Sequence, residues 1–482
     1  MIHRRKLLQG LGATAASTAL GGGAVSLAGR PGPARAGGAG GPPHILFISI
    51  DDLNDWVGIL GGHAKVRTPH VDRLARRGMS FENAHCAAPA CNPSRTATLT
   101  GIRPSTSGVY GNDQPFRRAL PDAVTLPQHL RTLGYRTLGC GKIFHVGDPG
   151  SWDEAWPDGC SWPPDGKRAL PRQRPANGIP GSRNFDWGPS RSKRDGVHSD
   201  DRVADWVIKQ IKKDWDQPTF LGCGFFRPHL PWYVPQSWFD EFPLEEVVLP
   251  AVIPDDLDDI PMAGRRMARI ADHQRIVNSG KWKEAVQAYM ASCAFADHQL
   301  GRVLDALRDS GKQRDTVVVL WSDHGWSLGT KFHWKKFALW EECTRIPLVI
   351  AAPGLTTKDS RSQGPVSLLD LYPTIVELAG GSAPDVVEGD SLVPLLQDPA
   401  REWDRPAVMT WGRGNHAVRS RRYRYIRYAD GSEELYDHQV DEHEWRNLAG
   451  DDRYADIIAS HAAWLPRVDA PEAPGGVHPC KR

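Results

Sequence analysis

The chain has 482 residues, of which 40% are hydrophobic and 24% are charged, which supports one large folded domain or a large domain with a smaller one. Its formal net charge of +2 is close to neutral, so whole-protein attraction to nucleic acid is not indicated and we expect no nucleic-acid partner. No internal repeat is visible in the sequence.

The first 36 residues have the features of an export signal. A charged start with Arg4 and Arg5 precedes a mildly apolar run rich in Gly and Ala, and Ala34-Arg35-Ala36 resembles a cleavage site. The adjacent arginines resemble a twin-arginine signal. A disordered tail or a membrane anchor is the alternative, but the run is short and glycine-rich for a membrane span, and no later segment is long enough. We expect an exported protein, periplasmic or extracellular, without stable membrane insertion.

Apolar, β-branched segments alternate with helical patterns along most of the chain. The predicted strands are 44–50, 135–140, 218–226, 316–323 and 346–354. The predicted helices are 69–78, 125–134, 202–213, 283–311 and 367–380. This alternation predicts an α/β fold with a large, mostly parallel central sheet and helices on both of its faces.

Two stretches depart from this alternation. Residues 146–198 are rich in Pro, Gly, Trp and Arg and show no period, which is typical of a functional or disordered segment. Short antiparallel strands with a turn at Asp430-Gly431 predict a small C-terminal subdomain over 385–482. The main domain is expected to cover 44–384.

The cysteines are widely scattered and include no CxxC pair. This pattern argues against a zinc ribbon, a thioredoxin-like motif and a small disulfide scaffold, and it leaves one or two bridges open without fixing their pairing. The eight cysteines are at positions 86, 91, 140, 160, 223, 293, 343 and 480.

Two of the predicted strands end in acidic residues. "FISIDD" places Asp51 and Asp52 after the first strand, and "VVLWSDHG" places Asp323 and His324 after another. Ligands of open α/β sheets gather at the carboxyl ends of the strands. Adjacent carboxylates repel each other in a poorly solvated site, and a hard divalent cation such as calcium or magnesium relieves that repulsion. Solvated loop acids are the alternative for "DD" alone, whereas the two motifs together favour a metal site.

Cys91 opens the segment "CNPSRTATLTG" and allows several interpretations. It could be a buried thiol, half of a disulfide, a metal ligand, a nucleophile or the precursor of another group. A thiolate suits a hard-cation site poorly because soft sulfur prefers softer metals. An aldehyde made from the same side chain removes that objection.

The segment resembles the Cys-x-Pro-Ser-Arg signature of the type I sulfatases, whose cysteine is oxidised to formylglycine. The wider pattern looks most like the iduronate-2-sulfatase branch and covers most of residues 44–450. The strings that carry the resemblance are "ILFISIDDLNDW", "TPHVDRLARRGMSFENAHC", "GYRTLGCGKIFH", "FFRPHLPW", "WSDHGWSLG", "HWKKFALWEE" and "ELYDHQVDEHEWRNLAG". The resemblance implies an alkaline phosphatase/sulfatase-like fold and maturation by a formylglycine-generating enzyme.

The resemblance also implies one bound cation, with calcium as the first expectation. The implied ligands are Asp51, Asp52, modified Cys91, Asp323 and His324. Many sulfatases have Asn where this chain has His324, whereas the iduronate-type branch has His. An imidazole nitrogen is an uncommon calcium ligand, so magnesium or another divalent metal stays open.

The other implied site residues are polar or basic. Arg95 is expected to hold the hydrated aldehyde, Lys142 and His145 to contact sulfate and the hydroxyls, and His229 and Lys336 to contact sulfate and the leaving group. Lys335 is adjacent to Lys336, and alternation predicts that only one of the two points inward.

The chemistry explains why these groups occur together. A sulfate ester loads negative charge onto its oxygens in the transition state, and fixed cations in a dry pocket stabilise that charge. A hydrated aldehyde offers two hydroxyls on one carbon, so that one can attack sulfur while His229 acts as the acid. The other can then lose its proton, toward His145, and expel sulfate.

The expected substrate is a sulfated carbohydrate, in line with an enzyme of glycan degradation. A basic set within 146–198 is predicted either to attract a polyanionic sugar or to be a solvated loop. This set contains Lys167, Arg168, Arg172, Arg174, Arg183, Arg191, Lys193 and Arg194.

Three alternative functions are weighed against the sulfatase. The first is a phosphodiester or phosphonate monoester hydrolase of the same superfamily, and the second is a non-catalytic protein that binds sulfated glycans. The third is a cysteine hydrolase, for which the chain lacks a recognisable Cys–His pair.

Overall fold

A computed structural model of the chain describes residues 41–158, 165–182, 184–192 and 196–476. All of these belong to one compact unit. The export signal predicted for residues 1–36 lies outside the described residues.

The central sheet has eight strands in the order β13-β2-β12-β9-β1-β7-β4-β5. Their bounds are Ser360–Ser362, Met79–Phe81, Leu348–Ala351, Thr316–Ser322, His44–Ile50, Thr219–Phe225, Arg136–Gly141 and Glu154–Trp156. The five strands from β9 to β5 are mutually parallel, which confirms the predicted mostly parallel sheet. The predicted strand 346–354 forms β12, which runs antiparallel to both β9 and β2.

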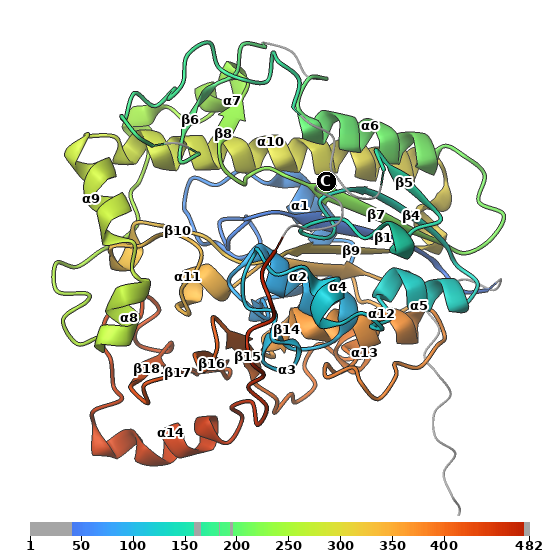
Figure 1. Cartoon of the computed structure of the whole chain (residues 1–482). Coiled ribbons are helices and arrows are strands. Elements are labelled where there is room, and N and C mark those ends of the chain that lie inside the picture. Colours follow the sequence, from blue (N-terminus) through green and yellow to red (C-terminus); the bar gives the residue numbers. More distant parts are fainter. Residues whose placement is uncertain (1–40, 159–164, 183, 193–195, 477–482) are drawn as a thin grey trace, which may run out of the picture. The chain divides into compact units, whose positions relative to one another are not determined.

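Alternation along β1 divides the core into two layers. Leu46, Ile48 and Ile50 point into one hydrophobic cluster, while Ile45 and Phe47 point into the other. The first cluster is covered by α1 (Pro69–Ala75), α6 (Ser199–Ile211) and α10 (Trp282–Asp309). The second is covered by α2 (Cys91–Thr100), α5 (Leu126–Thr132) and α12 (Leu371–Leu378), so helices lie on both faces as predicted (Figure 1).

The C-terminal part contains the predicted antiparallel sheet. Its strands, in order, are β15 (Ala407–Thr410), β16 (His416–Arg419), β17 (Tyr423–Arg427) and β18 (Glu433–Asp437). One face of this sheet packs on residues 338–340, just after Lys336, and the other packs near α14 (Ala455–Ala462). The boundary at residue 385 stays a prediction.

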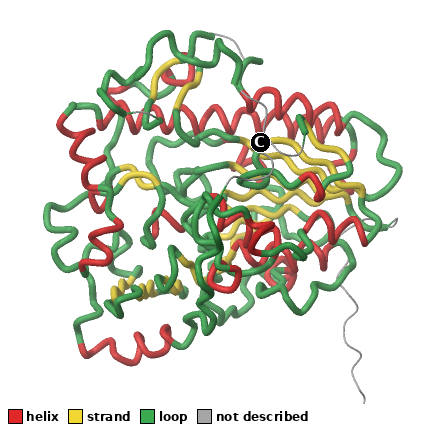
Figure 2. The backbone as a smooth tube through the Cα atoms, in the orientation of Figure 1, coloured by secondary structure: helices red, strands yellow, loops and turns green. Residues whose placement is uncertain are grey.

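The remaining elements are short and join the layers (Figure 2). The helices are α3 (Pro104–Ser107), α4 (Phe116–Ala119), α7 (Gln236–Asp240), α8 (Met262–Met267), α9 (Ile270–Asn278), α11 (Glu341–Thr344) and α13 (Val393–Gln397). The strands are β3 (Ala84–His85), β6 (Trp187–Pro189), β8 (Trp232–Val234), β10 (Ser327–Leu328), β11 (Trp334–Lys335) and β14 (Val366–Ser367). Six turns of 3-10 helix cover Pro149–Ser151, Leu244–Glu246, Lys312–Asp315, Thr330–Phe332, Leu368–Asp370 and Asp452–Tyr454.

The six cysteines among the described residues are all buried and free, and Cys160 and Cys480 lie outside the described residues. Among the helices of the described part, none combines the length and the apolar character that a membrane crossing requires.

Candidate active site

Asp51 and Asp52 lie where β1 ends, and a backbone turn brings their side chains together. Successive residues of a strand point to opposite faces, so two adjacent acids in extended chain would diverge. Asp52 instead has a φ of 61°, in the left-handed region that Asp tolerates better than most residues. Its carbonyl accepts a hydrogen bond from the Tyr289 hydroxyl at 2.8 Å, and its N–H donates to Oδ1 of Asp323 at 3.1 Å.

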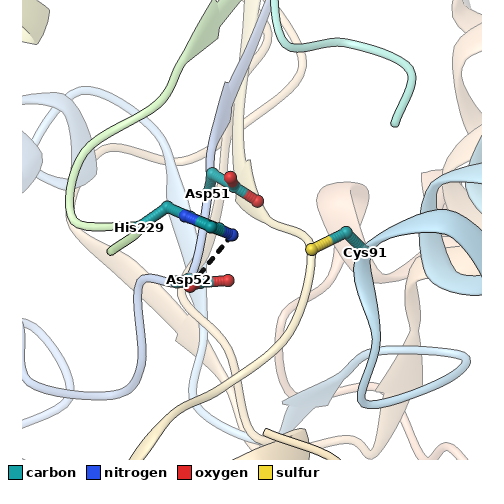
Figure 3. Close-up of side chains that lie close together, drawn as sticks. All are labelled: Asp51, Asp52, Cys91 and His229. Atoms are coloured by element: carbon teal, nitrogen blue, oxygen red, sulfur yellow. Dashed lines mark ion pairs between the residues drawn. The ribbon is translucent and has the colours of Figure 1, made fainter. Parts of the chain in front are cut away.

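Cys91 faces the acids from the first residue of α2. Figure 3 shows its sulfur directed toward the carboxylates of Asp51 and Asp52, with His229 beside them. The hydroxyl of Ser94 donates to the main-chain oxygen of Asp323 at 2.5 Å, which ties the start of α2 to the end of β9. The Cys91 side chain is 0% exposed. Residues from four separate parts of the chain therefore meet at one edge of the sheet.

The described residues form two overlapping groups of donor atoms here, each within 4.8 Å. One contains Asp51, Asp52, Cys91 and His229, and the other contains Asp51, Cys91, Asp323 and His324. Nδ1 of His324 lies 2.9 Å from the main-chain oxygen of Gly325 and must therefore donate a proton to it. Its Nε2 faces the site, 3.3 Å from Sγ of Cys91, 3.3 Å from Oδ1 of Asp52 and 3.4 Å from Oδ2 of Asp323.

These donors fit a hard divalent cation. Burial raises the pKa of Asp52 although His229 and Lys336 oppose that shift, so this carboxylate is incompletely compensated. Its Oδ2 atom is buried and has no hydrogen-bond partner. A buried carboxylate oxygen without a hydrogen-bond partner destabilises the folded protein unless a ligand binds to it. Carboxylate oxygens with one imidazole nitrogen are a suitable donor set for such an ion.

Arg95 compensates the acids from within the protein and is itself 0% exposed. Its Nε donates to Oδ2 of Asp323 at 2.8 Å and its Nη2 to Oδ1 of Asp51 at 3.2 Å. Burial opposes ionisation of Asp323, but Arg95, His324 and Lys142 together outweigh it and hold the pKa of that carboxyl below its usual value. The sequence predicted that Arg95 holds the hydrated aldehyde, whereas the contacts here place it on the two acids.

Two lysines approach the sulfur of Cys91. Nζ of Lys336 donates to Sγ at 2.9 Å and to Oδ1 of Asp52 at 2.5 Å, and Nζ of Lys142 lies 3.8 Å from Sγ and contacts Asp51. Burial raises the pKa of the Cys91 thiol, but the two ammonium groups outweigh it and hold the pKa well below its usual value. Negative charge at this position is thus strongly favoured. Lys335 points away and pairs with Asp272 at 2.8 Å.

Two histidines complete the surroundings of Cys91. His145 lies near the Cys91 side chain, and burial lowers the pKa of its imidazole although Cys91 opposes that shift. Nδ1 of His229 lies 2.6 Å from the main-chain oxygen of Leu230, and its Nε2 lies 3.8 Å from Oδ2 of Asp52. The His229 side chain is 27% exposed. The structure thus brings all the site residues predicted from the sequence to one place.

Sequence reasoning missed the residues that hold this arrangement. Ser94 lies inside the Cys-x-Pro-Ser-Arg motif, so the motif itself was the available signal. Tyr289 lies on the buried face of α10, where an aromatic residue is expected for packing alone, and no pattern marks its hydroxyl.

Family comparisons agree with this geometry. The profile of the family described as Sulfatase matches residues 43–382, which is more than half of the chain. The chain belongs to the sulfatase family. The profile described as N-sulphoglucosamine sulphohydrolase, C-terminal, matches residues 329–469 of this sulfatase.

Individual relatives support the same assignment. A sulfatase of Formosa agariphila is 41% identical over 443 residues, which cover 89% of this chain and 87% of that protein. The iduronate 2-sulfatase of Mus musculus is 28% identical over 385 residues, which cover 71% and 69%. The chain is therefore a sulfuric ester hydrolase, as predicted.

A solved structure shows the same fold. The phosphonate monoester hydrolase from Silicibacter pomeroyi matches this sulfatase with a TM-score of 0.73 and 24% identity, over 88% of this chain and 94% of that one. At that identity the likeness concerns the fold alone.

A divalent cation should stabilise this sulfatase through the acid cluster. We expect Ca²⁺ or Mg²⁺ to raise the melting temperature of protein stripped with EDTA, because a ligand of the folded state at 100 times its Kd adds about 2.7 kcal/mol. Asp323→Asn should abolish the increase, whereas Asp305→Asn, at a partly exposed ion pair with Arg73, should retain it. Differential scanning calorimetry measures the shift. A melting temperature of the wild type that ignores every divalent cation would contradict the site.

Proposed function

We propose that this protein is a formylglycine-dependent sulfatase that removes sulfate from a sulfated carbohydrate, with a 2-O-sulfated uronate glycan as the first candidate. The observation that carries the proposal is the meeting of Cys91, two ammonium groups and the acid cluster in one buried site. We further propose that the protein is exported, on the basis of its N-terminal sequence.

The proposed cation would be held by Asp51, Asp52, Asp323 and His324 together with an oxygen of the modified Cys91. When bound, it would supply Lewis acidity toward a sulfate oxygen and additional positive charge. The position of His324 Nε2, close to Asp52 and to Cys91, supports its inclusion among the ligands.

The proposed formylglycine would arise from Cys91 through a formylglycine-generating enzyme. Sγ of the unmodified side chain stands where an oxygen of the proposed group would lie, and the ammonium groups of Lys142 and Lys336 favour negative charge there. Its hydrated form supplies two hydroxyls on one carbon. A buried thiolate beside hard ligands has no comparable use, because soft sulfur is poorly matched to such an ion.

The basic side chains would bind the sulfate and stabilise its charge. Lys142 and Lys336 approach the same sulfur from two segments, so their ammonium groups can donate to the oxygens of a sulfate ester seated there. Arg95 would keep Asp51 and Asp323 ionised and fixed in place.

The two histidines would handle protons in different ways. Nδ1 of His229 donates to the Leu230 carbonyl, so the proton that His229 can transfer lies on Nε2, which faces the site. This partly exposed group would protonate the sugar oxygen as it leaves. Burial keeps His145 neutral by lowering the pKa of its imidazole, so it can accept a proton from a hydroxyl at the position of Cys91.

The choice of a sulfated glycan has two supports. Among the relatives is an iduronate 2-sulfatase, whose name states a sulfated uronate substrate. The described members of the basic set are all exposed, as a long-range attraction for a polyanion requires. These are Lys167, Arg168, Arg172, Arg174 and Arg191; Arg183, Lys193 and Arg194 lie outside the described residues.

A mass measurement tests the proposed modification. Trypsin should release residues 78–95, a peptide that contains both Cys86 and Cys91. We expect the active enzyme to take up one alkyl group on this peptide, at Cys86, and to show the mass deficit of an aldehyde in place of the second thiol. Two alkylated cysteines in fully active enzyme would refute the mechanism.

Changing the leaving group tests the role of His229. A general acid contributes about 10²–10⁴-fold when the leaving oxygen is basic. We expect His229→Gln to lower kcat/KM by about that factor on a sugar sulfate and far less on 4-nitrophenyl sulfate, whose phenolate leaves without help. Steady-state kinetics on both substrates measures the difference. Equal losses on the two would contradict the role.

A second candidate is an activity on phosphate diesters or phosphonates, since a phosphonate monoester hydrolase shares this fold and one fold can carry several chemistries. We expect kcat/KM for 4-nitrophenyl sulfate to exceed that for a matched aryl phosphodiester or phosphonate, because the wider sequence similarity is to sulfatases. Parallel kinetics with the same leaving group compare the two. A preference for the phosphorus ester would favour the second candidate.

A further inference from the structure

The turn that carries Lys336 has an unusual backbone. Seven non-glycine residues in the described part of the chain have a positive φ, and four of them lie in this turn, which spans residues 330–337. They are Lys331, Phe332, Lys335 and Phe337, with φ values of 51°, 49°, 77° and 80°. Such a backbone persists only where its surroundings hold it. Lys336 lies between two of these residues.

Lys336 lies just outside the β10–β11 hydrogen-bonding ladder. The β10–β11 ladder pairs Leu328 with Trp334 and Ser327 with Lys335, and it ends there. Beyond it, the N–H of Phe337 donates to the main-chain oxygen of Pro89 at 3.0 Å. The main-chain oxygen of Lys336 lies 3.0 Å from Nε2 of His333.

The geometry fixes the proton on the His333 ring. Its Nδ1 accepts a hydrogen bond from the N–H of Arg269 at 3.0 Å, so Nδ1 carries no proton. Nε2 therefore carries the proton and donates it to Lys336. The ring is 0% exposed, and burial lowers the pKa of His333 to about 3, so it is neutral at any ordinary pH.

Arg269, whose N–H donates to His333, belongs to a segment that has further contacts with the turn. Arg269 is the residue before α9, and α9 contacts the turn at two more points. Asp272 pairs with Nζ of Lys335 at 2.8 Å, and Nδ1 of His273 accepts from Nε1 of Trp334 at 3.1 Å. The turn thus rests on the start of α9, while Nζ of Lys336 points the other way, to Cys91 and Asp52.

We propose that His333 is a positioning residue that fixes Lys336 in the active site by bridging its main-chain oxygen to the N–H of Arg269. The kinetic consequence of this proposal rests on the proposed function, in which Lys336 binds the sulfate group. Its structural part stands on the two hydrogen bonds of His333 and on the left-handed residues beside Lys336.

Two amide variants separate the two hydrogen bonds of the ring. His333→Gln can place its amide nitrogen near the position of Nε2 and keep the donation to Lys336. His333→Asn can place its amide oxygen near Nδ1 and accept from Arg269, but it is too short to reach Lys336. We expect kcat/KM for an aryl sulfate to fall about 10- to 100-fold in His333→Asn, and less than about threefold in His333→Gln. His461→Gln, a change at a buried histidine of α14 that does not contact this turn, is the control and should stay near wild type.

Hydrogen–deuterium exchange supplies a readout that needs no catalysis. In protein with Cys91 unmodified, the amide of Phe337 should exchange faster in His333→Asn than in the wild type, His333→Gln or His461→Gln. Wild-type exchange at Phe337 in His333→Asn would overturn the proposal, as would equal kinetic losses in His333→Asn and His461→Gln.

His333→Gln decides the question on its own should His333→Asn not fold. A more than tenfold loss of kcat/KM in His333→Gln, or faster exchange of its Phe337 amide, overturns the proposal. Absence of sulfatase activity in the modified wild type would refute the proposed function instead, and the exchange data would still test the positioning.

Discussion

The burial of three carboxylates at one edge of the sheet is the constraint on which the site depends. Asp51, Asp52 and Asp323 are each 0% exposed, and uncompensated charges in such a place cost several kcal/mol each. Cations from three other segments compensate these charges. They are Arg95 from α2, Lys142 from the end of β4 and Lys336 from the turn after β11. Within this set of six residues, three acids face three bases, so their formal charges balance.

The contacts between these acids and bases also join separate parts of the fold. The acids come from two adjacent parallel strands, whose ends necessarily lie together. Arg95 and Ser94 join α2 to both strand ends, and the antiparallel C-terminal sheet packs on the residues just after Lys336. Through these contacts the helical layer and the C-terminal sheet both support the position of the same few atoms.

Much of this could be predicted from the sequence because it depends on local patterns. The run "HILFISIDD" predicts both a buried strand and the acids at its end, and a short motif identifies Cys91 as a site residue. The direction of β12 was not predictable, because a short apolar strand reads alike in parallel and antiparallel pairing. The left-handed backbone at Asp52 and the bridging role of His333 were also hidden, since each depends on contacts with residues far along the chain.

The complete burial of Cys91 has a consequence for the order of events in the life of the protein. A side chain enclosed by α2, the two strand ends and the lysine-bearing segments cannot enter the active site of a second enzyme. The proposed oxidation must therefore take place while this part of the chain is still unfolded. On the proposed twin-arginine route, which exports folded proteins, this maturation would take place in the cytoplasm before export.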